Sequence, residues 1–266
     1  MQSEAYKLTG FTAVAGALGF LLRWLQDMQI LDAETGLAEQ GRPISYIVAA
    51  VIVLMAAGLG AAAFSLRRCE IPAEPEKALA GKSFLYTAVC VVPAVLLFAA
   101  GVMMLFTAWP ESQATVRRLS GAGAMLAAIG TVLVAVNLKD PEKAGPRRVG
   151  VALLILFGGL WLIAEYKSAA SDPVLWRYAV EILAVCAALL SYYYIAGYFY
   201  GEPSPRLAVF CCFMGTFLCI MSAVDEHTLA VSVCYGAVAV QQLAWGYALV
   251  TNMRPAAERI PGAETD

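Results

Sequence analysis

Charged residues are scarce in this sequence, and their scarcity excludes a water-soluble fold. Lys, Arg, Asp and Glu make up 14% of the 266 residues, whereas about 25% is usual in soluble domains. Hydrophobic residues make up 61%, more apolar surface than a soluble chain of this length could bury. The net charge is −2 and the basic residues are spread over short loops, so we expect no nucleic-acid partner. The sequence therefore predicts that lipid surrounds the protein.

The sequence also has a single histidine and none of the common catalytic motifs. It contains no H-E-x-x-H, G-x-S-x-G, Walker A or G-x-G-x-x-G pattern. His227 alone cannot supply a metal or haem site that needs several histidines. Cys212 and Cys219 share a helical face, but two thiolates are too few for a metal site. We therefore predict no catalytic residue, no cofactor and no metal site.

Long apolar runs dominate the chain. A helix rises ~1.5 Å per residue, so roughly 20 apolar residues cross a ~30 Å hydrocarbon core. Such runs lie at 8–27, 44–66, 83–107, 119–138, 149–166, 174–200, 207–224 and 228–251. Arg23 and the lack of an Ala-x-Ala cleavage site favour a retained first helix over a secretory signal. The predicted fold class is all-α, a polytopic transmembrane helical bundle of about eight spans.

The whole chain, 1–266, reads as one integral membrane domain with a disordered polar tail at 254–266. With the N-terminus inside, roughly two thirds of the Lys and Arg fall on the cytoplasmic side, as short cytoplasmic loops favour. This predicts a multi-pass protein of a cytoplasmic (plasma) membrane with both termini cytoplasmic. Arg117 is expected in a short outer loop, and residues 225–227 are expected to form a solvated hairpin tip.

The fourth and eighth runs end alike, which raises the question of an internal duplication. VAVNLKDP at 134–141 and ALVTNMRP at 248–255 each place an Asn before a basic residue and a Pro. Two parallel four-helix halves, 8–138 and 149–252, would account for the likeness. Shared chemistry at the point where a helix leaves the membrane is the favoured alternative.

Six charged residues near the predicted outer ends of the spans form the candidate site. They are Arg23, Asp27, Glu165, Lys167, Arg177 and Glu181. Arg23 with Asp27, and Arg177 with Glu181, lie four residues apart, so each pair shares a helical face. Glu181 lies about 10 Å into its run, where a bare carboxylate is costly. Two interpretations stay open: ion pairs that anchor helix ends, and a polar vestibule that faces outward.

Three classes of function follow from these features. A non-catalytic membrane component, meaning an accessory, sensory or scaffold subunit, is favoured. The alternative is a small-solute permease or carrier that uses the vestibule, although Gln241, Gln242 and Ser191 give little midplane polarity. An intramembrane enzyme is third, and no enzyme activity is expected. The expected partners are the lipid bilayer and either a small solute or a partner membrane subunit.

Overall fold

The computed structural model describes residues 1–30, 43–72, 74–81, 84–138, 143–170, 178–225 and 228–255. Its helices are α1 (Gln2–Ile30), α2 (Pro43–Ser65), α3 (Phe84–Phe106), α4 (Glu111–Asn137), α5 (Ala144–Ala169), α6 (Ala179–Tyr200), α7 (Pro205–Ser222) and α8 (Leu229–Asn252). The described chain also contains the 3-10 helices η1 (Leu66–Arg68) and η2 (Pro75–Leu79) and the two-residue strands β1 (Cys69–Glu70) and β2 (Arg254–Pro255). The predicted all-α fold class is confirmed.

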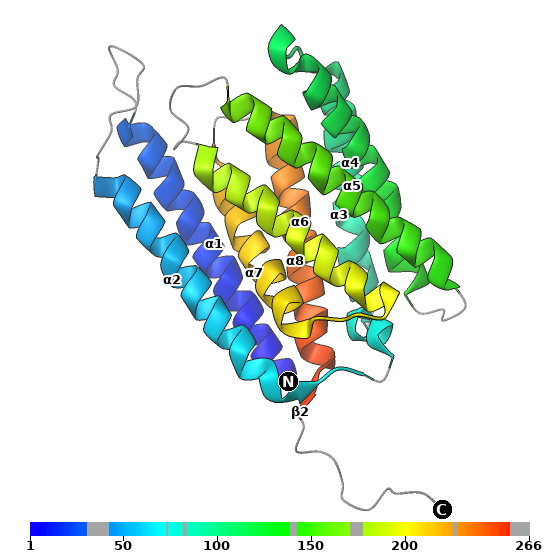
Figure 1. The fold of residues 1–266 in the computed structure, drawn as a ribbon. Coiled ribbons are helices and arrows are strands. Elements are labelled where there is room, and N and C mark those ends of the chain that lie inside the picture. Colours follow the sequence, from blue (N-terminus) through cyan, green and yellow to red (C-terminus); the bar gives the residue numbers. More distant parts are fainter. Residues whose placement is uncertain are drawn as a thin grey trace, which may run out of the picture.

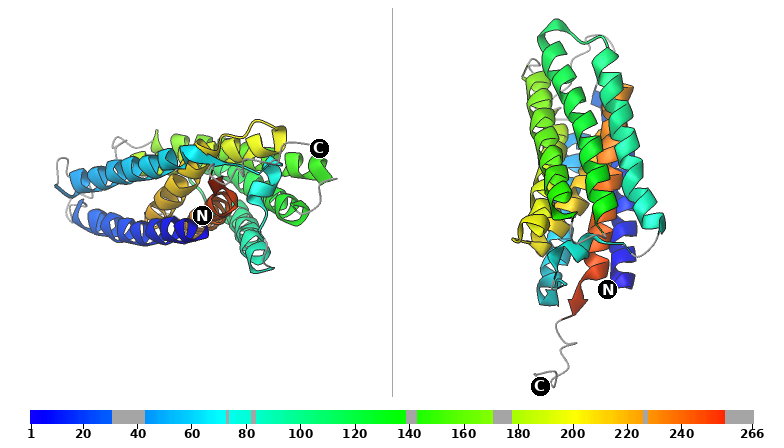
Figure 2. Two further views of the ribbon diagram at one scale, coloured as in Figure 1. Left: turned by 90° about the horizontal axis from the view of Figure 1, so that it is seen from below. Right: turned by 90° about the vertical axis from the view of Figure 1, so that its right-hand side faces the viewer.

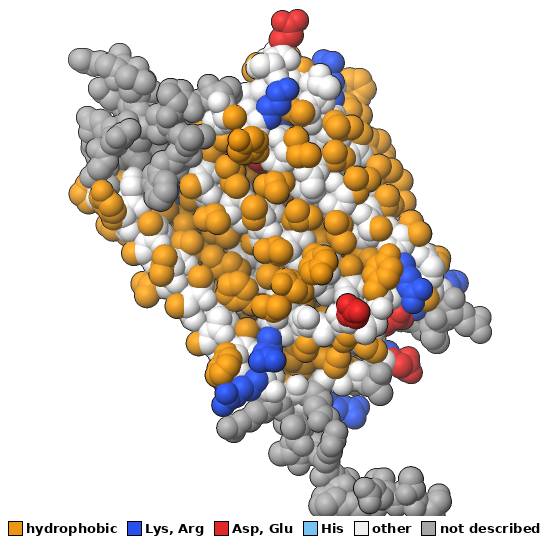
Figure 3. Space-filling model, viewed as in Figure 1, with side chains coloured by type: hydrophobic (Ala, Val, Ile, Leu, Met, Phe, Trp, Pro, Cys, Tyr) orange, Lys and Arg blue, Asp and Glu red, His pale blue; other side chains and the backbone are white. Residues whose placement is uncertain are grey.

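Each of the helices α1 to α8 is long and apolar enough to cross a membrane. Large apolar side chains such as Leu54, Val95 and Phe106 point away from the bundle and stay exposed. Figure 3 shows one face of the molecule covered by apolar side chains, with most of the charged ones near the two ends. Helices satisfy their own backbone hydrogen bonds, which is what a lipid environment requires. The chain is a multi-pass membrane protein.

The helices run up and down in turn, so that α1 begins and α8 ends at the same end of the bundle (Figure 1). We call this the lower end, and the opposite end, where α1 ends and α8 begins, the upper end. Helices α6, α7 and α8 pack on one another in the middle. Helices α1 and α2 lie against α7 on one side, and α3, α4 and α5 pack side by side on the other (Figure 2).

Glycines allow α4 to approach both of its neighbours closely. Gly121 of α4 lies against Gly101 of α3, and Gly130 of α4 lies against Gly150 of α5. A Cβ atom on Gly150 would lie 2.7 Å from the carbonyl oxygen of Gly130, closer than such atoms approach in proteins. Small residues at helix contacts are the usual device for packing in lipid, where the hydrophobic effect does not draw helices together.

The segment between α2 and α3 closes the lower end of the bundle. Ala78 and Leu79 of η2 are fully buried. The Asn252 side-chain amide, at the end of α8, donates to two carbonyls of this segment at 2.9 and 3.0 Å. Arg147, buried at the start of α5, pairs with Glu76 of η2. The connection is therefore held to α5 and α8 by polar contacts as well as by packing.

Several helices begin earlier than the sequence predicts. Helix α1 begins at Gln2 rather than at 8, α4 at Glu111 rather than at 119, and α5 at Ala144 rather than at 149. The extra turns are polar, so hydropathy alone does not register them. Asn137 and Asn252 both lie at the lower end, where α4 and α8 finish. The duplication of 8–138 in 149–252 stays a prediction, and residues 174–177 and 256–266 lie outside the described part of the chain.

The contact between α4 and α5 gives a test of the packing. We expect Gly150→Ala to lower the thermal unfolding temperature in detergent, because the new Cβ meets the Gly130 backbone. Gly159→Ala, on the same helix, meets no atom within 4 Å and gains up to about 1 kcal/mol of helix propensity. It should leave the unfolding temperature unchanged or raise it. Equal losses in the two variants would contradict the close α4–α5 approach.

Candidate functional site: a buried charge cluster

Five charged side chains from different parts of the chain lie buried at the upper end of the bundle. They are Arg23 of α1, Arg117 of α4, Glu165 of α5, Glu181 of α6 and Asp225, which follows α7, and none is more than 7% exposed. We call them the charge cluster. Ionised groups are almost never buried to this degree unless they are paired. The cluster therefore has to satisfy itself internally.

Arg117 and Glu165 form the first of its ion pairs. The two guanidinium Nη atoms of Arg117 donate to the two carboxylate oxygens of Glu165 at 2.8 and 3.0 Å. Arg117 Nη2 also donates to Ser168 Oγ at 2.8 Å, and the Trp161 indole N–H donates to Glu165 Oε1 at 2.9 Å. The guanidinium lies 5.4 Å from the centre of the Trp109 ring. This two-point geometry is the strongest form of ion pair available to arginine.

Arg23 and Asp225 form the second ion pair. Arg23 Nε donates to Asp225 Oδ1 at 2.6 Å, and Arg23 Nη1 donates to Gln26 Oε1 at 2.9 Å. Gln26 in turn donates from Nε2 to Ser45 Oγ of α2 at 3.2 Å. The contact joins α1 to the connection between α7 and α8, and continues to α2. It is a polar contact that holds the peripheral α1–α2 pair on the bundle.

Glu181 lies between the two ion pairs. It interacts electrostatically with Asp225, Glu165 and Arg23, and Arg117 also lies within its field. The Glu181 carboxyl also acts on that of Asp225. Two ionised carboxylates in a buried site repel each other, because neither can donate a hydrogen bond to the other. Binding of a proton by either carboxyl would therefore relieve repulsion within the cluster.

Asp225 is the member of the cluster that lies outside the membrane-spanning helices. Burial raises the pKa of its carboxyl from 3.8 to about 6, and Asp27 adds to the rise. Arg23 opposes this by favouring the charged form. The larger effect is burial, because removing a carboxylate from water costs more than one partner returns.

Three of the six predicted site residues belong to the cluster, namely Arg23, Glu165 and Glu181. Asp27 is half-buried and adds its charge to the field around Arg23. Lys167 is exposed and is not one of the five buried residues. Arg177, the predicted partner of Glu181, lies outside the described residues. The structure therefore brings three of the predicted residues together, and the predicted pairs Arg23–Asp27 and Arg177–Glu181 stay predictions.

Sequence reasoning missed Arg117 and Asp225. Each of them is one member of an ion pair, Arg117 with Glu165 and Asp225 with Arg23. Arg117 was expected in a loop, and this was wrong because α4 begins at Glu111 and carries it on a buried face. The helical period through Arg117, Gly121 and Ala124 is the signal that could have shown this. Asp225 was expected in a solvated tip, yet it is only 7% exposed because Arg23 draws it into the bundle. Glu226 and His227 lie outside the described residues.

A second set of buried polar groups lies deeper in the bundle. Gln241 of α8 donates to Thr131 Oγ1 at 2.9 Å and accepts from the Tyr192 hydroxyl at 3.3 Å. Gln242 is fully buried, and neither of its amide atoms has a hydrogen-bond partner among the described residues. Among those residues, no group of three or more His, Cys, Asp or Glu could hold a metal ion.

No protein-family model matches this chain, and neither a curated protein nor a solved structure matches it. Over the described residues, the fold and the site define a class of protein, a membrane bundle of eight helices with a charge cluster buried at one end.

The Arg117–Glu165 pair can be tested against a matched neighbour. Arg117→Gln leaves Glu165 buried without its counter-charge, a change that costs about 3 to 5 kcal/mol for fully buried pairs. We therefore expect a fall of several degrees or more in the unfolding temperature in detergent. Arg118→Gln alters an exposed arginine on the same turn and should have almost no effect. Equal effects in the two variants would show that Arg117 is not the buried partner of Glu165.

Proposed function

We propose that this chain is a non-catalytic membrane component of the sensory kind, in which the charge cluster responds to protons at the upper face of the membrane. The observation that carries the proposal is that the charged groups of the cluster are buried and directed at one another. An enzyme would need a nucleophile or base directed at a substrate. A carrier would need charged groups that reach water on one side.

The cluster contains more acidic than basic groups, which makes it sensitive to protonation. The acids are Glu165, Glu181 and Asp225, with Asp27 at the edge, and the bases are Arg23 and Arg117. With one of these acids protonated the charges nearly balance. Loss of that proton leaves an uncompensated negative charge in a medium of low dielectric constant, where such charges repel strongly. Deprotonation therefore favours separation of the groups at the upper end.

Loss of a proton from the cluster would affect the helices through the contacts of Asp225. It faces Arg23 and Asp27 from α1, Glu181 from α6 and Tyr235 from α8. Its ion pair with Arg23 holds α1 at the upper end. Repulsion between Asp225 and the neighbouring acids therefore acts directly on the α1 contact. A partner subunit that contacts α1 would then respond to the change in its position.

A specific observation favours a second candidate, a small-solute carrier. Gln242 is buried near the middle of α8 with both amide atoms unpartnered among the described residues, and an unsatisfied amide in a bilayer normally marks a functional position. A bound polar solute would supply the missing partners. Solute uptake into proteoliposomes that is lost in Gln242→Leu and kept in Asp225→Asn would favour the carrier over the sensor.

The sensory proposal predicts a particular dependence of stability on pH. Because the folded-state pKa of Asp225 is raised to about 6, the folded protein binds more protons than the unfolded chain between pH 3.8 and about 6. The stability from this group is thus full at low pH and is lost as pH rises through about 6. We expect the unfolding temperature in detergent to fall over this range in the wild type.

The same fall should be much smaller in Asp225→Asn, which cannot titrate. The control is Glu4→Gln, which removes an exposed carboxylate at the lower end and should keep the wild-type profile. The proposal fails if wild type and Asp225→Asn have parallel pH profiles.

A further inference from the structure

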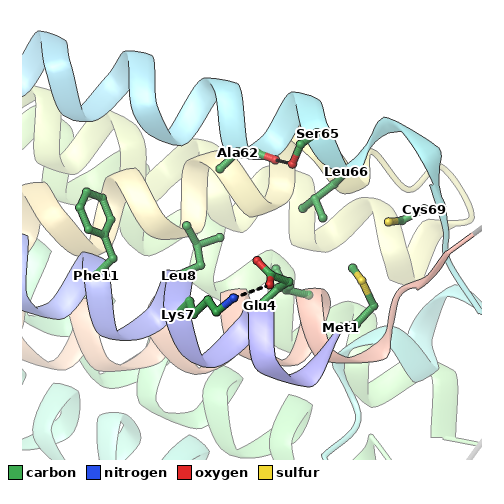
Figure 4. A pocket seen from close by; sticks show the side chains of 10 residues that line it. Met1, Glu4, Lys7, Leu8, Phe11, Ala62, Ser65, Leu66 and Cys69 are labelled. Atoms are coloured by element: carbon green, nitrogen blue, oxygen red, sulfur yellow. Dashed lines mark hydrogen bonds and ion pairs between the residues drawn. The ribbon is translucent and has the colours of Figure 1, made fainter.

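A groove between α1 and α2 opens at the lower end of the bundle, far from the charge cluster. It has a volume of about 410 Å³, within the about 300–1,000 Å³ range of small-ligand sites. Leu8 and Phe11 of α1 line one wall, Ala62 and Leu66 line the other, and Val250 of α8 also contributes to the lining. Figure 4 shows Leu8 and Phe11 farther along α1, and Glu4 and Lys7 nearer its start. The groove is thus apolar toward the middle of the membrane and polar at its lower mouth.

The groove exists because α1 and α2 both pack on α7 and touch each other little. Ala62 and Ser65 are small, so α2 does not fill the space opposite Leu8. In a bilayer this space faces lipid. An acyl chain is the ligand that matches its walls, and the lipid headgroup would then lie at the mouth, at the level of Lys7.

The charge of the lower end selects among lipid headgroups. Exposed basic side chains at this end are Lys7, Arg67, Lys77, Lys143, Arg148, Arg206 and Arg254. The exposed acids described there are Glu4, Glu74 and Glu202. The Lys7–Glu4 ion pair at the mouth is 2.9 Å long, but both side chains are more than 60% exposed. Such a pair contributes about 0–1 kcal/mol, so Lys7 is free to turn to a stronger anionic partner.

We propose that this groove binds one anionic phospholipid, with an acyl chain along Leu8, Phe11 and Leu66 and its phosphate at Lys7. Arg67, which is next in sequence to Leu66 of the groove and lies over the Phe64 ring, adds positive charge at the same end of the bundle. A basic residue near an anionic lipid surface contributes about 1 kcal/mol, which corresponds to a factor of about five in affinity. The site is independent of the charge cluster and of the proposed proton response.

The test compares lipids that differ only in headgroup charge. The full-length protein is reconstituted in nanodiscs of equimolar phosphatidylglycerol and phosphatidylcholine and extracted in mild detergent, and the lipids that remain bound are counted by native mass spectrometry. We expect one retained phosphatidylglycerol per protein. Lys7→Gln should lower the ratio of retained phosphatidylglycerol to phosphatidylcholine about five-fold. Ala62→Trp, which fills the groove, should abolish retention of both lipids.

Matched controls separate the groove from general surface charge and from loss of folding. Lys143→Gln removes an exposed lysine at the same end but away from the groove. Ala57→Trp adds a ring to an exposed position on α2 outside it. Both should retain the lipid as the wild type does. Equal retention of the two lipids by the wild type, or an equal loss in Lys7→Gln and Lys143→Gln, would overturn the proposal.

Discussion

The structure at the upper end depends on one physical constraint, namely that charge buried in a membrane protein must be neutralised by other buried charge. Arg117 and Glu165 meet this constraint with two parallel hydrogen bonds, and Arg23 and Asp225 meet it with one at 2.6 Å. The first pair joins the consecutive helices α4 and α5, and the second joins α1 to the connection between α7 and α8. Breaking either pair would leave a buried charge without a partner in a medium of low dielectric constant. The two pairs therefore hold α1, α4, α5 and the connection after α7 in one arrangement.

The rest of the bundle supports this arrangement. Glycines set the short distance between α4 and α5, and that distance places Arg117 within reach of Glu165. At the lower end, η2 is held by Asn252 and by the Arg147–Glu76 ion pair. Helix α1 extends between the two ends of the bundle. Its last turns carry Arg23, and its first turns line the groove between α1 and α2.

Much of the fold could be predicted from the sequence, because long apolar runs form membrane-spanning helices in a bilayer. Half of the site could be predicted too, since Glu181 is an acid too deep in its run to be ignored. Arg117 and Asp225 could not be assigned, because their burial follows from partners that are far away in sequence. Arg23 illustrates the limit: its neighbour Asp27 was visible from spacing, whereas Asp225 becomes its partner only after the helices pack.

The central claim is that Arg23 and Asp225 are a buried pair that holds α1 on the bundle. A double-mutant cycle with Arg23→Gln, Asp225→Asn and the double variant tests it directly, read as the free energy of unfolding in detergent at pH 7. The account predicts that Arg23→Gln is strongly destabilising in the wild type, where it leaves buried acids without a counter-charge, and less so in the Asp225→Asn background, with a coupling energy of about 1–3 kcal/mol. Additive effects of the two changes would contradict it.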